Sequence, residues 1–176
     1  MHSTYMAILD MYDKISESID RHDVSIGVFI DLSKAFDTIN HKILIDKLEH
    51  YGIRELPLQW FKDYLCNRKQ YVYYNNATSS LRTITCGVPQ GSILGPLLFV
   101  LYVNDVMNCS ELLHFILFAD DTNLFYCSNN YEDLMKNVNA ELSKLSDWFR
   151  ANRLSLNISK TNYILFGNRR KCLTDT

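Results

Sequence analysis

Hydrophobic residues follow two periodicities along the chain, and these predict its secondary structure. In residues 4–20 and 130–150 they recur near every third or fourth position, which is typical of amphipathic helices. The second segment shows the cleaner pattern, with spacings of 4, 4, 3 and 4 between Leu134, Val138, Leu142, Leu145 and Phe149. Both segments are therefore predicted to be helices with one buried face.

Shorter runs of β-branched and aromatic residues predict strands. Five such runs occur, at residues 25–32, 70–75, 81–86, 116–126 and 162–166. The first ends on Asp31. The second and third are joined by the polar segment NNATSS and predict a hairpin. The fourth predicts two strands joined by a turn, with Asp120 and Asp121 in that turn.

Three further helices are predicted between the strands. Gly52 is placed to end a helix over residues 41–52, and Pro57 begins a helix that runs to Leu65. Residues 95–106 are apolar on all sides and predict a buried helix. The order is helix, strand, helices, hairpin, helix, hairpin, helix, strand. This order predicts the α+β class, an antiparallel sheet with helices packed on one face.

The composition is that of an ordinary globular domain. The chain has 176 residues, 47% of them hydrophobic, and a net charge of −2, unlike a free-standing duplex-binding domain. The longest fully apolar run, residues 97–103, is too short to span a membrane, and no signal peptide is visible. We therefore expect an intracellular protein of the nucleus or cytoplasm, not secreted and without membrane contact. The five cysteines form no C-x-x-C pair, so no zinc site or disulfide framework is predicted.

Three carboxylates are the candidate chemical groups. If the strand that ends at Asp31 pairs beside the hairpin of Asp120 and Asp121, all three meet at one edge of a sheet. Carboxylate oxygens suit Mg²⁺, and two such ions can promote phosphoryl transfer. The alternatives are a plain hairpin turn and, for Asp31, a helix cap. Nearby, the glycine-rich loop at residues 86–96 suits phosphate binding or is an ordinary connection.

Four sequence blocks together resemble a known family. FIDLSKAFDTINH, GVPQGSILGPLLFVLYVND, FADD and LSLNISKT occur in this order. The set resembles the palm domain of a reverse transcriptase, an RNA-directed DNA polymerase, from a non-LTR (LINE-type, jockey-like) retrotransposon. The resemblance covers residues 2–171 and implies an α+β polymerase palm.

The resemblance implies a metal-binding set. The aspartates matching Asp31 and Asp120 hold two catalytic Mg²⁺ ions in that family, and Asp121 belongs to the same acidic cluster. The backbone carbonyl of Leu32 is implied to be a further metal ligand. These groups would support nucleotidyl transfer from a dNTP to a primer 3′-hydroxyl.

It also implies a nucleotide-binding set. Phe36 falls where the family excludes a sugar 2′-hydroxyl, although an aromatic near a strand end is often a core residue. Gln90 is expected to contact the dNTP, and Gly91 to let the backbone approach it. Lys160 matches a lysine that donates a proton to pyrophosphate, although a lone lysine is usually solvated. Asp37 and His41 are interpreted as caps or supporting groups.

We therefore expect a reverse transcriptase domain over residues 1–171, lacking most of the fingers and the thumb, with a tail at 172–176. Its partners would be an RNA template, a DNA primer, dNTP and the fingers, thumb and endonuclease regions of a longer polyprotein. Activity of this piece alone is expected to be low or absent. Two alternatives are a nucleotide cyclase and a palm-like or RRM-like binding module without catalysis. In the latter, Tyr71, Tyr73 and Tyr74 would stack on bases.

Overall fold

The computed structural model describes residues 4–118 and 121–167. The chain divides into two compact units, which are described separately. The first comprises Met1–Ser33 and Asp105–Thr176, and the second is Lys34–Asn104.

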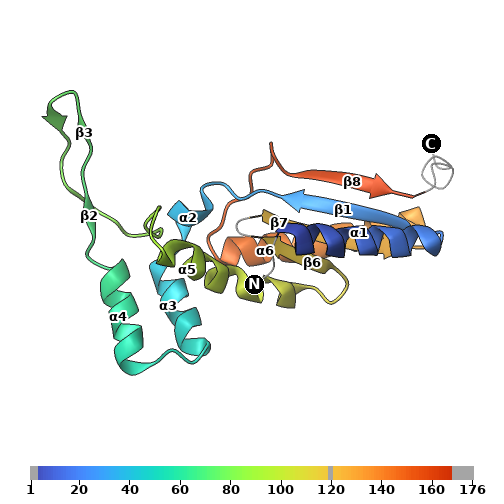
Figure 1. The fold of residues 1–176 in the computed structure, drawn as a ribbon, viewed down its shortest axis with the longest axis horizontal. Helices are drawn as coiled ribbons and strands as arrows, with labels where there is room; N and C mark the ends of the chain where they lie inside the picture. Colours follow the sequence, from blue (N-terminus) through green and yellow to red (C-terminus); the bar gives the residue numbers. More distant parts are fainter. Residues whose placement is uncertain (1–3, 119–120, 168–176) are drawn as a thin grey trace. The chain divides into compact units, whose positions relative to one another are not determined.

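The first unit is built on a four-stranded antiparallel sheet with the strand order β6-β7-β1-β8 (Figure 1). The strands are β1 (Val24–Ile30), β6 (His114–Phe118), β7 (Asp121–Ser128) and β8 (Asn162–Phe166). The helices of this unit are α1 (Thr4–Asp20) and α6 (Tyr131–Ala151). These elements match the predicted ones closely, and the α+β class with an antiparallel sheet is confirmed. The turn was expected at Asp120 and Asp121. Asp120 lies outside the described residues, and Asp121 is instead the first residue of β7, paired with Phe118 of β6.

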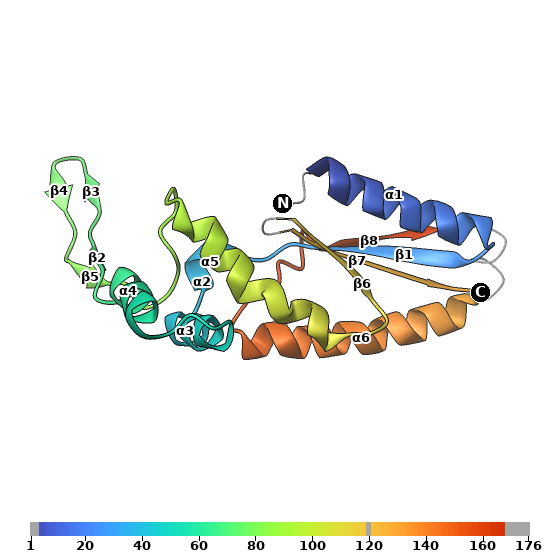
Figure 2. The ribbon, with the colours of Figure 1, turned by 60° about the horizontal axis from the view of Figure 1, so that its bottom comes forward.

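The two helices cover opposite faces of the sheet (Figure 2). His114 Nε2 lies 2.9 Å from Asp10 Oδ2 of α1, and His114 is directly opposite Phe125 in the sheet. The next residue, Tyr126, accepts a hydrogen bond of 3.0 Å from Asn137 of α6. Successive side chains of a strand point to opposite faces, so α1 and α6 lie on different sides. In this respect the structure differs from the expected single helical face.

This arrangement explains the apolar composition of β1. Six of its seven residues are buried, with no alternation between exposed and buried positions. Helix α6 presents the predicted stripe, and Leu134, Val138, Leu145 and Phe149 are all buried. Its first turn is capped by Asn130, whose side chain accepts a hydrogen bond from the Glu132 amide. Burial of each such large apolar side chain contributes about 1.5–3 kcal/mol.

The second unit contains four helices. They are α2 (Ala35–Thr38), α3 (His41–His50), α4 (Glu55–Leu65) and α5 (Leu94–Val103). A 3₁₀ helix, η1 (Asn104–Cys109), follows α5 in the chain, and from Asp105 on it belongs to the first unit. Asn40 caps α3 by accepting from the Ile43 amide. Gly52 follows its end with a φ of +92° and donates to the Glu49 carbonyl, as predicted for a C-terminal glycine. Helix α5 buries Leu98, Phe99 and Tyr102, consistent with the predicted buried helix.

A narrow hairpin connects α4 to α5 in place of the two longer strands predicted. It contains four two-residue strands, namely β2 (Lys69–Gln70), β3 (Tyr73–Tyr74), β4 (Ala77–Thr78) and β5 (Arg82–Thr83). Its tip is Asn75 and Asn76, which have φ values of 47° and 60°, the backbone sign that a type I′ turn needs. All strand residues are exposed, so no apolar face supports a longer ladder. Among the described helices, none is long and apolar enough to cross a membrane.

Candidate active site

Asp31 and Asp121 lie at adjoining ends of neighbouring strands. Strand β1 ends at Ile30, which is opposite Thr122 of β7. Asp31 follows the last residue of β1, and Asp121 is the first residue of β7. The register therefore brings both to the same end of these two central strands. Asp31 is half-buried and Asp121 is exposed. Asp120 lies outside the described residues, and within those residues no group of three acidic, His or Cys side chains could hold a metal.

The Asp31 carboxylate is held by a loop from the far end of the chain. Asn157 Nδ2 donates to Asp31 Oδ2 over 2.8 Å. The backbone amide of Asn157 also donates to the Asp31 backbone carbonyl over 2.9 Å. The Thr161 hydroxyl lies 3.5 Å from the Asp31 amide, at the limit of a hydrogen bond. Both the side chain and the backbone of Asp31 are thus fixed by the segment that follows α6.

The backbone carbonyl of Leu32 takes no part in the contact between Asp31 and the loop that follows α6. Leu32 is opposite Leu156 in an isolated antiparallel bridge. The bridge uses the Ser33 amide, which donates to the Ser155 carbonyl, and the Asp31 carbonyl. In such a pair the central residues direct their own N–H and C=O groups away from each other. The Leu32 carbonyl therefore faces away from Leu156, while its side chain is buried.

Lys160 lies in a tight turn beside this contact. The Asn157 carbonyl accepts from the Lys160 amide at 3.1 Å and from the Thr161 amide at 2.9 Å. The Lys160 side chain is exposed. Asn157 thus contacts both Lys160 and Asp31. The structure gives no contact between the Lys160 and Asp31 side chains.

The remaining predicted site residues belong to the second unit, around the loop that precedes α5. This loop is attached to α2 by backbone hydrogen bonds, from Val88 to the Phe36 carbonyl and from Gly87 to the Ile39 carbonyl. His41 Nε2 lies 2.7 Å from the Gly87 carbonyl oxygen. The supporting role predicted for His41 is consistent with this contact, which fixes the loop.

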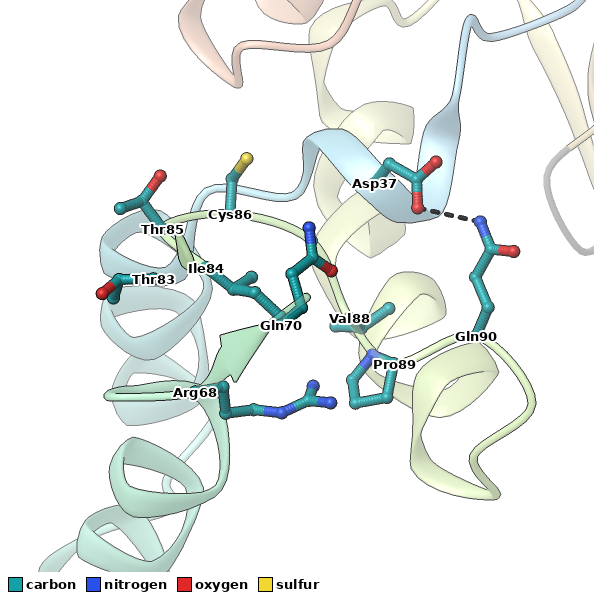
Figure 3. A pocket seen from close by; sticks show the side chains of 11 residues that line it. Asp37, Arg68, Gln70, Thr83, Ile84, Thr85, Cys86, Val88, Pro89 and Gln90 are labelled. Atoms are coloured by element: carbon teal, nitrogen blue, oxygen red, sulfur yellow. Dashed lines mark hydrogen bonds between the residues drawn. The ribbon is translucent and has the colours of Figure 1, made fainter. Parts of the chain in front are cut away.

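Gln90 is fixed by a side chain of α2. Its Nε2 donates to Asp37 Oδ1 over 2.8 Å, and both side chains are at the edge of a pocket of about 670 Å³ (Figure 3). Arg68 extends into the same pocket toward Pro89 (Figure 3). Gly91 follows with a φ of +79°, and a Cβ there would meet nothing within 4 Å. Glycine at position 91 thus serves the backbone conformation and leaves open space beside it.

Phe36 is half-buried and packs against Phe99 of α5, with ring centroids 4.9 Å apart. Phe36 is therefore partly a core residue, as the alternative interpretation expected, and part of its side chain stays exposed. Its proposed contact with a sugar stays a prediction, as do the nucleotide contacts of Gln90 and Gly91.

The donor atoms of the first unit fit a hard divalent cation. Asp31 and Asp121 supply carboxylate oxygens, and Leu32 supplies a carbonyl oxygen that no loop contact uses. All are oxygen ligands, which Mg²⁺ prefers. Sequence reasoning missed Asn157, the residue that fixes Asp31. Its position in the LSLNISKT block gave no signal, because asparagine in a polar segment is also typical of an ordinary turn.

The antiparallel sheet, with Asp31 and Asp121 at adjoining strand ends, has the arrangement expected from the four sequence blocks. The chain belongs to the reverse transcriptase (RNA-dependent DNA polymerase) family, whose sequence profile matches residues 4–173. The family predicted from the four sequence blocks is therefore confirmed.

Two relatives come from mobile elements of Drosophila melanogaster. The chain is 30% identical over 177 residues to the probable RNA-directed DNA polymerase from transposon X-element, covering 97% of this chain and 19% of that protein. It is 26% identical to the RNA-directed DNA polymerase from mobile element jockey, covering 87% of this chain and 17% of that protein. The chain thus spans less than a fifth of the length of these relatives.

Solved telomerase structures share the fold. Telomerase from Candida albicans, solved with a TWJ fragment of telomeric RNA, aligns with a TM-score of 0.71 and 16% identity, covering 96% of this chain and 31% of that one. Apo telomerase from Candida tropicalis, truncated from its C-terminal domain, aligns with a TM-score of 0.68 and 14% identity, covering 94% and 36%. At this identity the likeness establishes the fold alone.

Proposed function

We propose that this chain is the palm segment of an RNA-directed DNA polymerase encoded by a non-LTR retrotransposon. It would take part in adding deoxynucleotides from dNTP to a DNA primer on an RNA template. The observation that supports this most is the register of β1 and β7, which brings Asp31 and Asp121 to the same end of these two neighbouring strands. Their carboxylates, with that of Asp120, would provide the negative charge that this chemistry needs.

Asp31, Asp120, Asp121 and the Leu32 carbonyl would hold two Mg²⁺ ions. Bound there, the ions would favour ionisation of the primer 3′-hydroxyl and stabilise charge on the leaving pyrophosphate. The protein's own part is to hold these oxygen ligands in place while their negative charge is kept. Asp31 fits this part, because its described partner, Asn157, is a neutral amide.

In the proposed reaction the primer 3′-oxygen forms a bond to the α-phosphorus of the dNTP. The bond from that phosphorus to the bridging oxygen breaks, and pyrophosphate leaves. Lys160 would donate a proton to the pyrophosphate. Its exposed ammonium, on a turn fixed to Asp31 through Asn157, supports this role.

Selection of the nucleotide is assigned to the second unit. Phe36 would exclude a 2′-hydroxyl by contact, and Gly91 would let the backbone approach the substrate. Gln90 would contact the dNTP through its amide. One of its N–H groups is engaged by Asp37, and within residues 4–118 and 121–167 its carbonyl oxygen and second N–H have no other hydrogen-bond partner and would be available to a substrate.

The template and primer would be RNA and DNA. We expect the fingers, thumb and endonuclease regions of a longer polyprotein to supply basic surfaces that track the phosphate backbone. These would offset the net charge of −2 on this chain. The site of action would be intracellular, in the nucleus or the cytoplasm.

A second candidate is a nucleic-acid-binding module without catalysis. It is supported by the hairpin, where Tyr71, Tyr73 and Tyr74 are 59%, 65% and 80% exposed. Residues 67–86 contain three basic and no acidic residues. Exposed aromatics in a basic segment suit stacking of single-stranded bases. Such binding would need no metal, which distinguishes it from the polymerase.

Primer extension tests the first proposal. An oligo(dT) primer on poly(rA), with dTTP and Mg²⁺, would be given to this chain and to a longer protein that restores its flanking coding sequence. We expect extension by the longer protein and little by this chain alone. Asp31→Asn and Asp121→Asn should each abolish extension. Asp13→Asn, an exposed residue of α1, makes the same charge change away from the site and should retain it.

Extension that survives Asp31→Asn would refute the proposed role of this carboxylate. Metal-independent binding of single-stranded RNA, with no extension by either protein, would favour the binding module. In that case Tyr73→Ala and Tyr74→Ala should weaken the binding.

A further inference from the structure

Asn157 makes more polar contacts with Asp31 than any other described residue, and it does so across 126 positions of sequence. Its side-chain amide donates to the Asp31 carboxylate at 2.8 Å, and its backbone amide donates to the Asp31 carbonyl at 2.9 Å. Both residues are half-buried. The side chain of Asp31 is therefore tied to one position relative to its own backbone.

The contact with Asp31 sets the direction of the Asn157 side-chain amide, and Ser159 contacts its other end. The Ser159 hydroxyl donates to Asn157 Oδ1 over 2.7 Å. A carboxylate can only accept, so Nδ2 must be the atom that faces Asp31. The Ser159 hydroxyl can donate or accept and so accommodates this orientation, whereas rotation of the side-chain amide by 180° would turn Oδ1 toward the carboxylate and break the contact with Asp31.

The chemistry of this donor matters for the site. A lysine or arginine at this place would pair with the carboxylate and compete with a divalent cation for it. An amide is neutral, so it can hold Oδ2 while the negative charge of Asp31 is kept. No other partner of this carboxylate occurs among residues 4–118 and 121–167. Oδ1 is thus left without a partner in the part of the chain that is described.

Asn157 also fixes the turn that carries Lys160. Its carbonyl accepts from the Lys160 and Thr161 amides and, at 3.0 Å, from the Thr161 hydroxyl. A displacement of Asn157 would therefore move two groups at once, the Asp31 carboxylate and the segment that bears the Lys160 ammonium.

We propose that Asn157 is a positioning residue that holds the Asp31 carboxylate ready for a divalent cation. The proposal rests on the proposed polymerase function, because it assumes that Asp31 is a metal ligand. Outer hydrogen-bond partners of ligating groups typically contribute about 10- to 100-fold to metal affinity. Loss of the Asn157 side chain should therefore weaken cation binding with little effect on dNTP binding.

The test measures Mn²⁺ binding to this chain by the electron paramagnetic resonance signal of free Mn²⁺. Wild type, Asp31→Asn and Asn157→Ala would be compared with Asn162→Ala. Asn162 is the matched control, because its side-chain amide donates to the Lys160 carbonyl at 2.8 Å in the same turn and makes no contact with Asp31. We expect Asn157→Ala to weaken binding about tenfold or more, and Asn162→Ala to leave it unchanged.

Two further measurements separate positioning from a general loss of structure. Ser159→Ala leaves Asn157 in place and frees its amide, so it should weaken Mn²⁺ binding by less than Asn157→Ala. In the longer protein, Asn157→Ala should lower kcat and raise the Mg²⁺ concentration needed for half activity, with the KM for dNTP nearly constant.

Equal Mn²⁺ affinities of the Asn157→Ala and Asn162→Ala variants, whether weakened or not, would overturn the positioning role alone. If wild type and Asp31→Asn bound Mn²⁺ equally, the proposed metal site would fail and the role of Asn157 with it. The two failures are therefore distinguishable within one experiment.

Discussion

Replacement of Gly87 by alanine tests how the loop before α5 is seated on α2. Gly87 has a φ of +82°, and a Cβ there would lie 2.8 Å from the Asp37 carbonyl oxygen and 3.0 Å from the Asp37 Cα. Both atoms belong to the backbone, so no side chain can rotate out of the way. The loop would have to move, and its hydrogen bonds to Ile39 and His41 would be strained.

Gly91 provides the matched control for the size of this effect. Its φ of +79° is nearly the same, but a Cβ there would meet nothing within 4 Å. Each alanine meets the left-handed conformation, at a cost of about 1–2 kcal/mol. Both reduce the entropy of the unfolded chain equally, and this effect cancels in the comparison. Only Gly87→Ala adds a steric clash, which should cost about 1–3 kcal/mol more.

The assay is unfolding in urea, followed by the fluorescence of Trp60 in a Trp148→Phe background, because Trp60 lies on α4 in the same unit. We expect the free energy of unfolding to fall about 1–3 kcal/mol further in Gly87→Ala than in Gly91→Ala. Equal losses in the two variants would show that the close approach of Gly87 to the Asp37 backbone adds no cost, contrary to this prediction.

Two further predictions concern groups away from the site. A hydrogen bond from Lys144 lowers the pKa of the buried Glu141, so this carboxylate stabilises the fold above the pKa it has when unfolded and less as pH falls through its folded pKa. Glu141→Gln should therefore reduce the free energy of unfolding at about pH 7, and the difference from wild type should shrink toward about pH 3; a constant difference would contradict this. Burial raises the pKa of the Cys109 and Cys127 thiols, so iodoacetamide should alkylate both more slowly than the exposed Cys66, as mass spectrometry of the peptides would show. Reaction of either half-buried thiol faster than Cys66 would contradict this prediction.

Periodic apolar patterns predicted the long elements of this fold well. The helices at residues 4–20 and 130–150 and the strand at 162–166 are present within one residue of their expected bounds. Their patterns are long or uninterrupted, so burial and propensity agree. The hairpin after α4 was predicted less well, because its strands have exposed side chains and pair only in two-residue steps.

The sequence of β1 contains a signal for helices on both faces of the sheet. Strand β1 has no polar alternation, and a continuous apolar run is consistent with a strand buried on both faces. The pattern alone does not distinguish such a strand from a buried helical segment.

The candidate site was predictable only in part. The aspartates stand out as acidic residues at strand ends, and the family resemblance named them. The contact from Asn157 to Asp31 joins residues that are 126 positions apart, so no local pattern indicates it. The same holds for the bond from Gln90 to Asp37, which spans 53 positions. Asp120 lies outside the described residues, so its role stays a prediction, as do the roles of the nucleotide-binding residues.

The position of Asp31 depends on the register of β1, and side-chain size supplies the signal that fixes it. Because both faces of β1 are buried, polarity cannot distinguish the correct register from a shift of one residue. The face toward α6 carries Val24, Ile26, Val28 and Ile30. The face toward α1 carries Ser25, Gly27 and Phe29, of which Ser25 and Gly27 are small.

Gly27 is the tightest of these positions. A Cβ there would lie 3.3 Å from the Phe166 ring of β8 and 3.4 Å from the Phe29 ring. A shift by one residue would press a branched side chain into this space and leave a gap beneath α6, and both changes are destabilising. It would also carry Asp31 to the opposite face of the sheet. The packing that selects the register of β1 therefore also places Asp31 beside the start of β7, where Asp121 lies.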